Sequence, residues 1–217
     1  TNEFARSYLQ GVRIVLTLSI AAGVGLLLYA KEILTVLFRY GAFDAQAVDA
    51  TTPIVAIYGM GLVFYSLATF ATRALHAHAD MRTPVRIAAI CLIVNVAMSL
   101  LLMRFIGVSG LATANVIAAA VQMCLLWRGL RRHTLDCGFA RILPALMQTL
   151  AAVVAMAAVC LLVKFASGWY FEDSDHLRSL TTLLLGIPLG VATFTIGLWV
   201  TRFEEFNFLR KLATRRT

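Results

Sequence analysis

The sequence RALHAHADMRTPVR, residues 73–86, is a short basic connector between two long apolar runs, residues 50–72 and 87–103. Neither run contains an Asp, Glu, Lys or Arg. A helix needs about 20 mostly apolar residues to cross the hydrocarbon core of a bilayer. The two runs therefore predict two membrane-spanning helices, and the connector predicts a loop on one side of the membrane.

Four further uncharged runs extend this pattern over the whole chain. The six runs are Ile14–Ala30, Ala50–Thr72, Ile87–Met103, Ile106–Trp127, Ile142–Val163 and Ser179–Thr201. Hydrophobic residues make up 60% of the chain and charged residues 14%, and the mean hydropathy is +0.83, far from the composition of a soluble domain. Strands of a membrane barrel would be about half as long and would alternate in polarity. We predict an all-α, polytopic membrane bundle of six transmembrane helices.

The Lys and Arg residues are distributed unevenly between alternate connectors. Of the 19 Lys and Arg, fourteen fall in the N-terminal segment, the second and fourth connectors and the C-terminal segment. The other five are Lys31, Arg39, Arg104, Lys164 and Arg178. Because positive residues favour the cytoplasmic side, both termini are predicted to be cytoplasmic. Anionic lipid at the inner surface then explains the net charge of +8, and we expect no nucleic-acid partner.

Three polar side chains, Asn95, Ser99 and Asn115, lie inside the third and fourth runs. Asn95 and Ser99 are four residues apart and share one helical face. A tight turn at residues 104–110 is expected to bring Asn115 back to about the same depth. Intramembrane polar residues are functional candidates, and they also hydrogen-bond neighbouring helices. Both interpretations remain open.

Local patterns predict where several helices begin and end. Segment 31–44 combines apolar residues at helical spacing with charges, which predicts a short helix in the outer interface, ended by Gly41. Asp44 is expected to cap the second helix, with Pro53 in its first turns. Thr83 and Pro84 predict the N-cap and the first position of the third helix.

Other residues have mainly structural interpretations. Gly23 and Gly25 offer close helix approach in lipid. The four cysteines lack metal-ligand spacing, and we interpret them as core packing. His76 and His78 are two residues apart with no further ligand nearby, which favours surface histidines over a metal site.

Residues 130–138 (LRRHTLDCG) are a polar, basic break in the chain. They predict a boundary between residues 1–133, with four helices, and residues 134–217, with a final helix pair and a basic tail. In the last pair, Pro144 lies near the start of the fifth run. Pro188 should kink the sixth, and Gly186 and Gly190 permit close approach of a neighbour or a lipid chain.

The residue patterns of common enzyme sites are missing from the sequence. There is no nucleophile elbow, phosphate-binding glycine loop or zinc spacing, and the six runs contain no acid, base or charged nucleophile. We therefore expect that the chain is not an enzyme and that it binds no cofactor.

Four segments together resemble the C-terminal part of the MurJ (MviN) family, the bacterial lipid II flippases of the multidrug/oligosaccharidyl-lipid/polysaccharide exporter superfamily. They are LFRYGAFD (37–44), RALHAHADMRTPVRI (73–87), GVSGLATAN (107–115) and FLRKLATRRT (208–217). The resemblance covers essentially the whole chain. It implies a fourteen-helix protein of the bacterial inner membrane, of which this chain supplies the last six helices.

The resemblance also implies roles for particular residues. The last two helices would form an apolar groove for the undecaprenyl tail of lipid II, and Pro144, Gly186, Pro188 and Gly190 are its candidate residues. Arg73, Arg82 and Pro84 would support the inner gate. Some family members hold Na⁺ at positions matching Asn95, Ser99, the carbonyl of Leu111 and Asn115, although Ser99 and Asn115 stand where a carboxylate and a hydroxyl can occur.

The implied function is movement of lipid II between leaflets by alternating access, with lipid II, membrane lipids and the family's N-terminal helices as partners. The arginines that receive the lipid II headgroup would lie in those N-terminal helices. Two alternatives are open: transport of another lipid-linked oligosaccharide or a drug, and a membrane scaffold that transports nothing.

Overall fold

The computed structural model describes residues 2–41, 43–131, 142–170 and 175–200, without the side chains of residues 2–6 and 170. Within these ranges the chain forms six helices. They are α1 (Asn2–Phe38), α2 (Ala45–Ala77), α3 (Arg82–Ile106), α4 (Val108–Leu130), α5 (Leu143–Tyr170) and α6 (Asp175–Val200). All six are long and apolar enough to span a membrane. The predicted all-α bundle of six transmembrane helices is confirmed.

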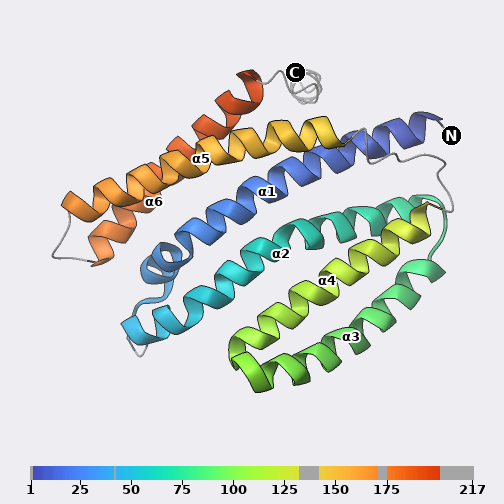
Figure 1. The fold of residues 1–217 in the computed structure, drawn as a ribbon, viewed down its shortest axis with the longest axis horizontal. Coiled ribbons are helices and arrows are strands. Elements are labelled where there is room, and N and C mark those ends of the chain that lie inside the picture. Colours follow the sequence, from blue (N-terminus) through green and yellow to red (C-terminus); the bar gives the residue numbers. More distant parts are fainter. Residues whose placement is uncertain (1, 42, 132–141, 171–174, 201–217) are drawn as a thin grey trace.

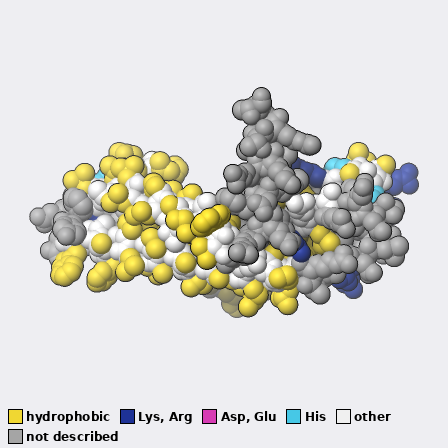
Figure 2. Space-filling model, turned by 90° about the horizontal axis from the view of Figure 1, so that it is seen from above, with side chains coloured by type: hydrophobic (Ala, Val, Ile, Leu, Met, Phe, Trp, Pro, Cys, Tyr) yellow, Lys and Arg dark blue, Asp and Glu magenta, His cyan; other side chains and the backbone are white. Residues whose placement is uncertain are grey.

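Successive helices run in opposite directions (Figure 1). The start of α1, the α2–α3 connector and the end of α4 lie at one end of the bundle, which was predicted to be cytoplasmic and is called the inner end below. The α1–α2 and α3–α4 connectors lie at the opposite, outer end. Figure 2 shows hydrophobic side chains along the bundle and most of the visible Lys and Arg toward the inner end.

Helix α1 lies between two groups of helices. Helix α2 packs along one side of it and α5 and α6 along another (Figure 1). One cluster of buried residues joins Val12 of α1 to Leu75 of α2 and Leu126 of α4. A second cluster joins Tyr29 of α1 to Met156 of α5 and Phe194 of α6. The final helix pair is therefore attached to the rest of the bundle through α1.

Two glycines allow α1 and α2 to approach closely. A Cβ atom added to Gly23 would lie 2.5 Å from the carbonyl oxygen of Gly59, and one added to Gly59 would lie 3.0 Å from the carbonyl oxygen of Gly23. A Cβ atom at Gly25 would meet nothing within 4 Å. Only Gly23 therefore serves the packing role that was expected of both.

The predicted interfacial helix is not a separate element. Residues 31–38 continue α1 without a break, although Figure 1 shows the last turns of this helix changing direction. At 37 residues, α1 would measure about 55 Å, well beyond a hydrocarbon core of about 30 Å. The charged last turns can thus reach the outer interface without a helix boundary before Lys31.

The start of α2 agrees with the sequence in part. The Asp44 carboxylate accepts a 2.9 Å hydrogen bond from the backbone N–H of Ala47, which confirms the predicted cap. Pro53 lies further into α2 than expected, because the helix already begins at Ala45. The hydroxyls of Thr51 and Thr52 just before it bond to the backbone one turn back.

The start of α3 was predicted two residues too late and with the wrong cap. The helix begins at Arg82, and the backbone N–H of Thr83 donates to the Asp80 carboxylate over 3.0 Å. Asp80 therefore takes the role that was assigned to Thr83. Pro84 still lies in the first turn, where its missing N–H leaves no bond unmade.

A single residue, Gly107, separates α3 from α4. Its φ of +60° lies in the left-handed region, which favours glycine. The predicted tight hairpin is confirmed.

The cysteines differ in environment. Cys91 and Cys160 are buried, as predicted for core packing, but Cys124 is exposed, so the prediction is wrong there. Cys137, the predicted boundary between residues 133 and 134, and the basic tail lie outside the described residues.

Candidate functional site

The polar residues of α3 and α4 form one hydrogen-bonded cluster. The amide nitrogen of Asn95 donates to the side-chain oxygen of Asn115 over 3.1 Å, and the Ser99 hydroxyl donates to the side-chain oxygen of Asn95 over 3.1 Å. These bonds agree with the expectation that the three side chains lie at about the same level, and their part in a functional site stays a prediction. All three are partly buried between the two helices.

The oxygen atoms of this cluster are of a kind that can coordinate a monovalent cation. Hard cations bind carbonyl, amide and hydroxyl oxygens, and Asn95, Ser99 and Asn115 supply three neutral ones. Leu111 lies one helical turn before Asn115 on α4, so its carbonyl faces the same level. The cluster contains no carboxylate, and within the described ranges no three His, Cys, Asp or Glu gather as metal ligands.

Two of the four predicted groove residues face other helices. A Cβ atom added to Gly186 would clash with the hydroxyl of Tyr29 on α1, and one added to Gly190 would lie 2.9 Å from the sulfur of Cys160 on α5. The Tyr29 hydroxyl also donates to the carbonyl oxygen of Cys160 over 3.2 Å. These glycines therefore hold α6 against α1 and α5.

The other two predicted groove residues, Pro144 and Pro188, are exposed on the outside of the bundle. Helix α6 continues through Pro188. The four residues therefore do not line one common surface: the glycines are internal contacts and the prolines face outward.

The inner connector between α2 and α3 has a defined backbone geometry. The N–H of Ala79 donates to the carbonyl of His76, and the N–H of Asp80 to that of Leu75, which is the Schellman pattern of helix ends. Ala79, at the position where glycine is usual, has a φ of +58°. The connector between α2 and α3 is thus a turn of defined backbone geometry.

The predicted gate residues lie around this turn. Arg73 and Arg82 are exposed, whereas Pro84 is buried. Arg73 lines an open depression of about 390 Å³ between α1 and α2, together with Ser19, Tyr65 and Phe70. Their part in gating stays a prediction.

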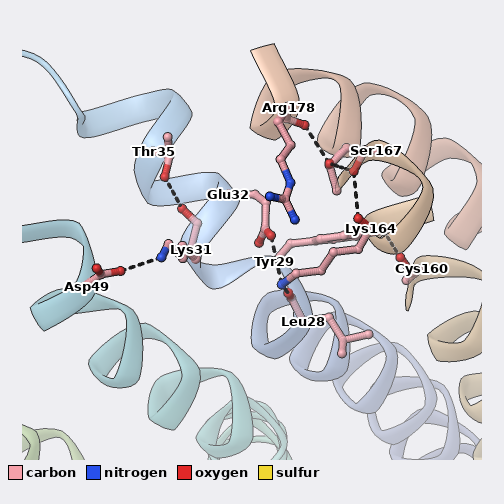
Figure 3. Close-up of polar contacts among 11 residues, drawn as sticks. Leu28, Tyr29, Lys31, Glu32, Thr35, Asp49, Cys160, Lys164, Ser167 and Arg178 are labelled. Atoms are coloured by element: carbon pink, nitrogen blue, oxygen red, sulfur yellow. Dashed lines mark hydrogen bonds and ion pairs between the residues drawn. The ribbon is translucent and has the colours of Figure 1, made fainter. Parts of the chain in front are cut away.

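A polar cluster at the outer end was not predicted from the sequence (Figure 3). The Lys164 ammonium of α5 lies 2.9 Å from the Glu32 carboxylate of α1 and donates to the carbonyl oxygen of Leu28 over 3.0 Å. Glu32 is only 8% exposed, so this is a largely buried carboxylate. Its second oxygen is also buried and has no hydrogen-bond partner among the described residues.

Two further ion pairs surround this contact. Lys31 lies 2.7 Å from Asp49 of α2, and Arg39 lies 3.0 Å from Asp175 of α6. Helices α1, α2, α5 and α6 therefore meet at a cavity of about 280 Å³ lined by charged side chains.

The sequence contained a signal for this cluster. Lys164 is a single charge between the apolar residues 142–163 and the small and aromatic residues that follow, and Glu32 follows a long apolar run. By their positions in the sequence, both are predicted to be connector charges. Their contact joins residues more than 130 positions apart, which spacing along the chain does not reveal.

Comparison with known proteins identifies the family. The model of one protein family, described as "Lipid II flippase MurJ", matches residues 1–174. The chain belongs to the MurJ lipid II flippase family. The resemblance to this family that the sequence suggested is confirmed, and family membership together with the six spanning helices assigns the chain to the bacterial inner membrane.

Curated relatives carry the same description. A lipid II flippase MurJ of Burkholderia cenocepacia is 26% identical over 211 residues, which are 97% of this chain and 41% of the relative. A probable lipid II flippase MurJ of Rhizobium meliloti is 31% identical over 189 residues, which are 85% of this chain and 34% of the relative. The chain thus spans about two fifths of the length of its MurJ relatives.

A solved structure supports the fold. A lipid II flippase MurJ in an inward closed conformation matches 91% of this chain and 40% of its own length, with a TM-score of 0.69 and 21% sequence identity. The six helices of this chain therefore have the arrangement found in part of a MurJ fold.

Proposed function

We propose that this chain is the C-terminal part of a lipid II flippase, which moves the undecaprenyl-linked peptidoglycan precursor from the cytoplasmic to the periplasmic leaflet by alternating access. The observation that carries the proposal is the family match over residues 1–174. Six of fourteen helices would account for the two fifths of a relative that the chain spans. The remaining helices of the family would supply the headgroup cavity.

The arrangement of α5 and α6 agrees with this role. The pair packs on α1 and presents exposed apolar side chains to its surroundings, among them Leu162, Leu184 and Val191. Such a surface suits a long isoprenoid chain, because apolar side chains carry no hydrogen-bonding group that lipid would leave unsatisfied. The groove in this proposal consists of outward-facing residues of the pair, including Pro144 and Pro188, with Gly186 and Gly190 as its internal support.

The proposal is tested by growth of a cell depleted of its own MurJ. This sequence joined to the N-terminal helices of the family should restore growth and lipid II movement, whereas this chain alone should restore neither. If the joined protein reaches the membrane in normal amounts and growth still stops, the assignment is wrong. A translocation assay with lipid II and with another lipid-linked oligosaccharide distinguishes the cargo alternative.

The same proposal includes Na⁺ as a coupling ion at Asn95, Ser99, the carbonyl of Leu111 and Asn115. The support is the set of neutral oxygens that these residues bring together. Since an apolar replacement of this cluster would remove those oxygens, it should reduce transport. Full transport after such a replacement would instead favour the scaffold alternative for this part of the protein.

Transport of this kind requires no covalent chemistry. We accordingly propose no enzymatic activity for the chain: its residues would bind and move a lipid, and no bond in the cargo would form or break.

A further inference from the structure

Among the described residues, the lining of the charged cavity at the outer end contains one more basic side chain than acidic ones. Its lining contains four basic residues, Lys31, Arg39, Lys164 and Arg178, and three acidic ones, Glu32, Asp49 and Asp175. Each acid pairs with one of the first three cations. Arg178 is left, and among the described residues no carboxylate lies within ion-pair distance of its guanidinium.

The guanidinium of Arg178 lies close against Gly168 of α5. A Cβ atom added to Gly168 of α5 would lie 2.7 Å from a guanidinium nitrogen of Arg178, so the absence of a side chain there lets the group lie against α5. In Figure 3 the Arg178 side chain reaches toward Glu32 and Lys164. The positive charge is therefore directed into the cavity between the helices.

The same side chain borders an apolar surface that faces outward. Two open depressions adjoin it, of about 380 Å³ and about 670 Å³. Arg178 and Phe165 line both, Trp169 lines the first, and Leu161 and Leu162 line the second. Phe165 is 77% exposed and Trp169 79% exposed. Arg178, which has no carboxylate partner among the residues that the structure describes, thus lies at the outer end of an apolar strip on α5.

We propose that this site binds one membrane glycerophospholipid of the outer leaflet, with its phosphodiester on Arg178 and an acyl chain along Phe165 and Leu161. A phosphodiester carries a single negative charge, which is complementary to the Arg178 guanidinium. A guanidinium binds phosphate oxygens through two parallel hydrogen bonds. The ammonium of Lys164, which borders both the cavity and the larger depression, is a second donor.

The depth of the site agrees with a phospholipid headgroup. Trp169 is exposed beside Arg178, and tryptophan is enriched where the hydrocarbon core meets the headgroups. From Phe165 to Ala158, which also lines the larger depression, α5 rises about 10 Å toward the bilayer centre. The upper part of an acyl chain can cover that length. The inference does not depend on the proposed function, although Leu162 borders both this site and the surface proposed for the isoprenoid chain, so the test below compares the two lipids.

The test is native mass spectrometry of the transport-competent protein purified from nanodiscs of phosphatidylethanolamine and phosphatidylglycerol. The unaltered protein should retain one phospholipid. Arg178→Ala should lower that occupancy roughly tenfold, since a charge-assisted contact is lost, and Arg178→Lys should keep part of it. Arg104→Ala is the matched control, because Arg104 is an exposed outer arginine that lines none of these depressions, and it should change nothing.

Three results would overturn the proposal. Equal occupancy in Arg178→Ala and the unaltered protein would show that the guanidinium holds no lipid. Equal retention of diacylglycerol, which lacks the phosphate, would show an apolar contact without headgroup recognition. Displacement of the phospholipid by an equal amount of lipid II would show that the site belongs to the transported lipid. The thermal unfolding midpoint of each variant, measured alongside, separates lost binding from lost folding.

Discussion

The ammonium of Lys164 lies 2.9 Å from the Glu32 carboxylate and 3.0 Å from the carbonyl oxygen of Leu28. One side chain of α5 therefore contacts both a side chain and the backbone of α1. The contact lies at the outer end of the only helix, within the described chain, that belongs to both buried clusters. Its loss should loosen the attachment of the final helix pair.

Replacement of Lys164 by Met should lower the free energy of unfolding by about 2–3 kcal/mol. The reason is that Glu32 would remain a largely buried carboxylate without a cation, and breaking a buried ion pair costs about 3–5 kcal/mol. We expect a smaller loss here because the Lys164 side chain is 37% exposed. Adding Glu32→Gln should recover part of the loss. Chemical unfolding of both single variants and the double variant measures the coupling, and strictly additive effects would show that the pair contributes nothing.

Replacement of Gly23 by Ala should separate α1 from α2, whereas the same change at Gly25 should not. The added methyl at position 23 meets a backbone carbonyl of α2, and at position 25 it meets open space. We expect a loss of about 1–3 kcal/mol for Gly23→Ala and no loss for Gly25→Ala, since alanine favours a helix over glycine. Thermal unfolding in detergent compares the two, and equal midpoints would contradict the packing role of Gly23.

Replacement of Ser99 by Asp should strengthen binding of Na⁺ at the polar cluster of α3 and α4. The change adds a carboxylate to a set of neutral oxygens, and charge count tunes cation affinity. The unfolding midpoint of Ser99→Asp should therefore rise more with added Na⁺ than that of the unaltered protein. Potassium chloride at the same concentration controls for ionic strength, and an equal rise in both salts would remove Na⁺ from the proposal.

Joint replacement of Arg82 and Pro84 by Ala should impair flipping more than membrane insertion. Arg82 lies at the N-terminus of α3, where a positive charge is unfavourable against the helix dipole. Arg82 is therefore not expected to stabilise α3. Arg86→Ala, one turn further along α3, is the matched control. Quantifying protein in the membrane alongside lipid II movement checks this, and a parallel fall in both would reduce the connector to a topology signal.

The sequence predicted what depends on composition and periodicity. Uncharged runs are a direct consequence of burial in lipid, so the six helices and their alternation could be read from the chain. Asn95, Ser99 and Asn115 were found because a polar residue stands out in such a run, and because the Gly107 hairpin fixes the depth at which the chain returns.

What the sequence did not predict depends on contacts between distant segments. Gly186 looks like a groove residue until Tyr29, far away in the chain, is seen against it. Lys164 and Glu32 resembled connector charges because each is close to the end of an apolar run. The cap of α3 was misassigned for a local reason: Asp80 and Thr83 are both good caps, and only the backbone geometry shows which one accepts the bond.

The position of α1 between the two clusters also matters while the protein is being made. The hydroxyl of Thr17 pairs with Thr149 at 2.9 Å, that of Tyr29 with the backbone of Cys160, and Glu32 with Lys164. Every one of these partners leaves the ribosome more than a hundred residues after α1 does. These polar groups of α1 therefore lack these partners in the membrane until α5 has been inserted. A nascent chain that stalls between α4 and α5 should consequently be exposed to proteolytic quality control.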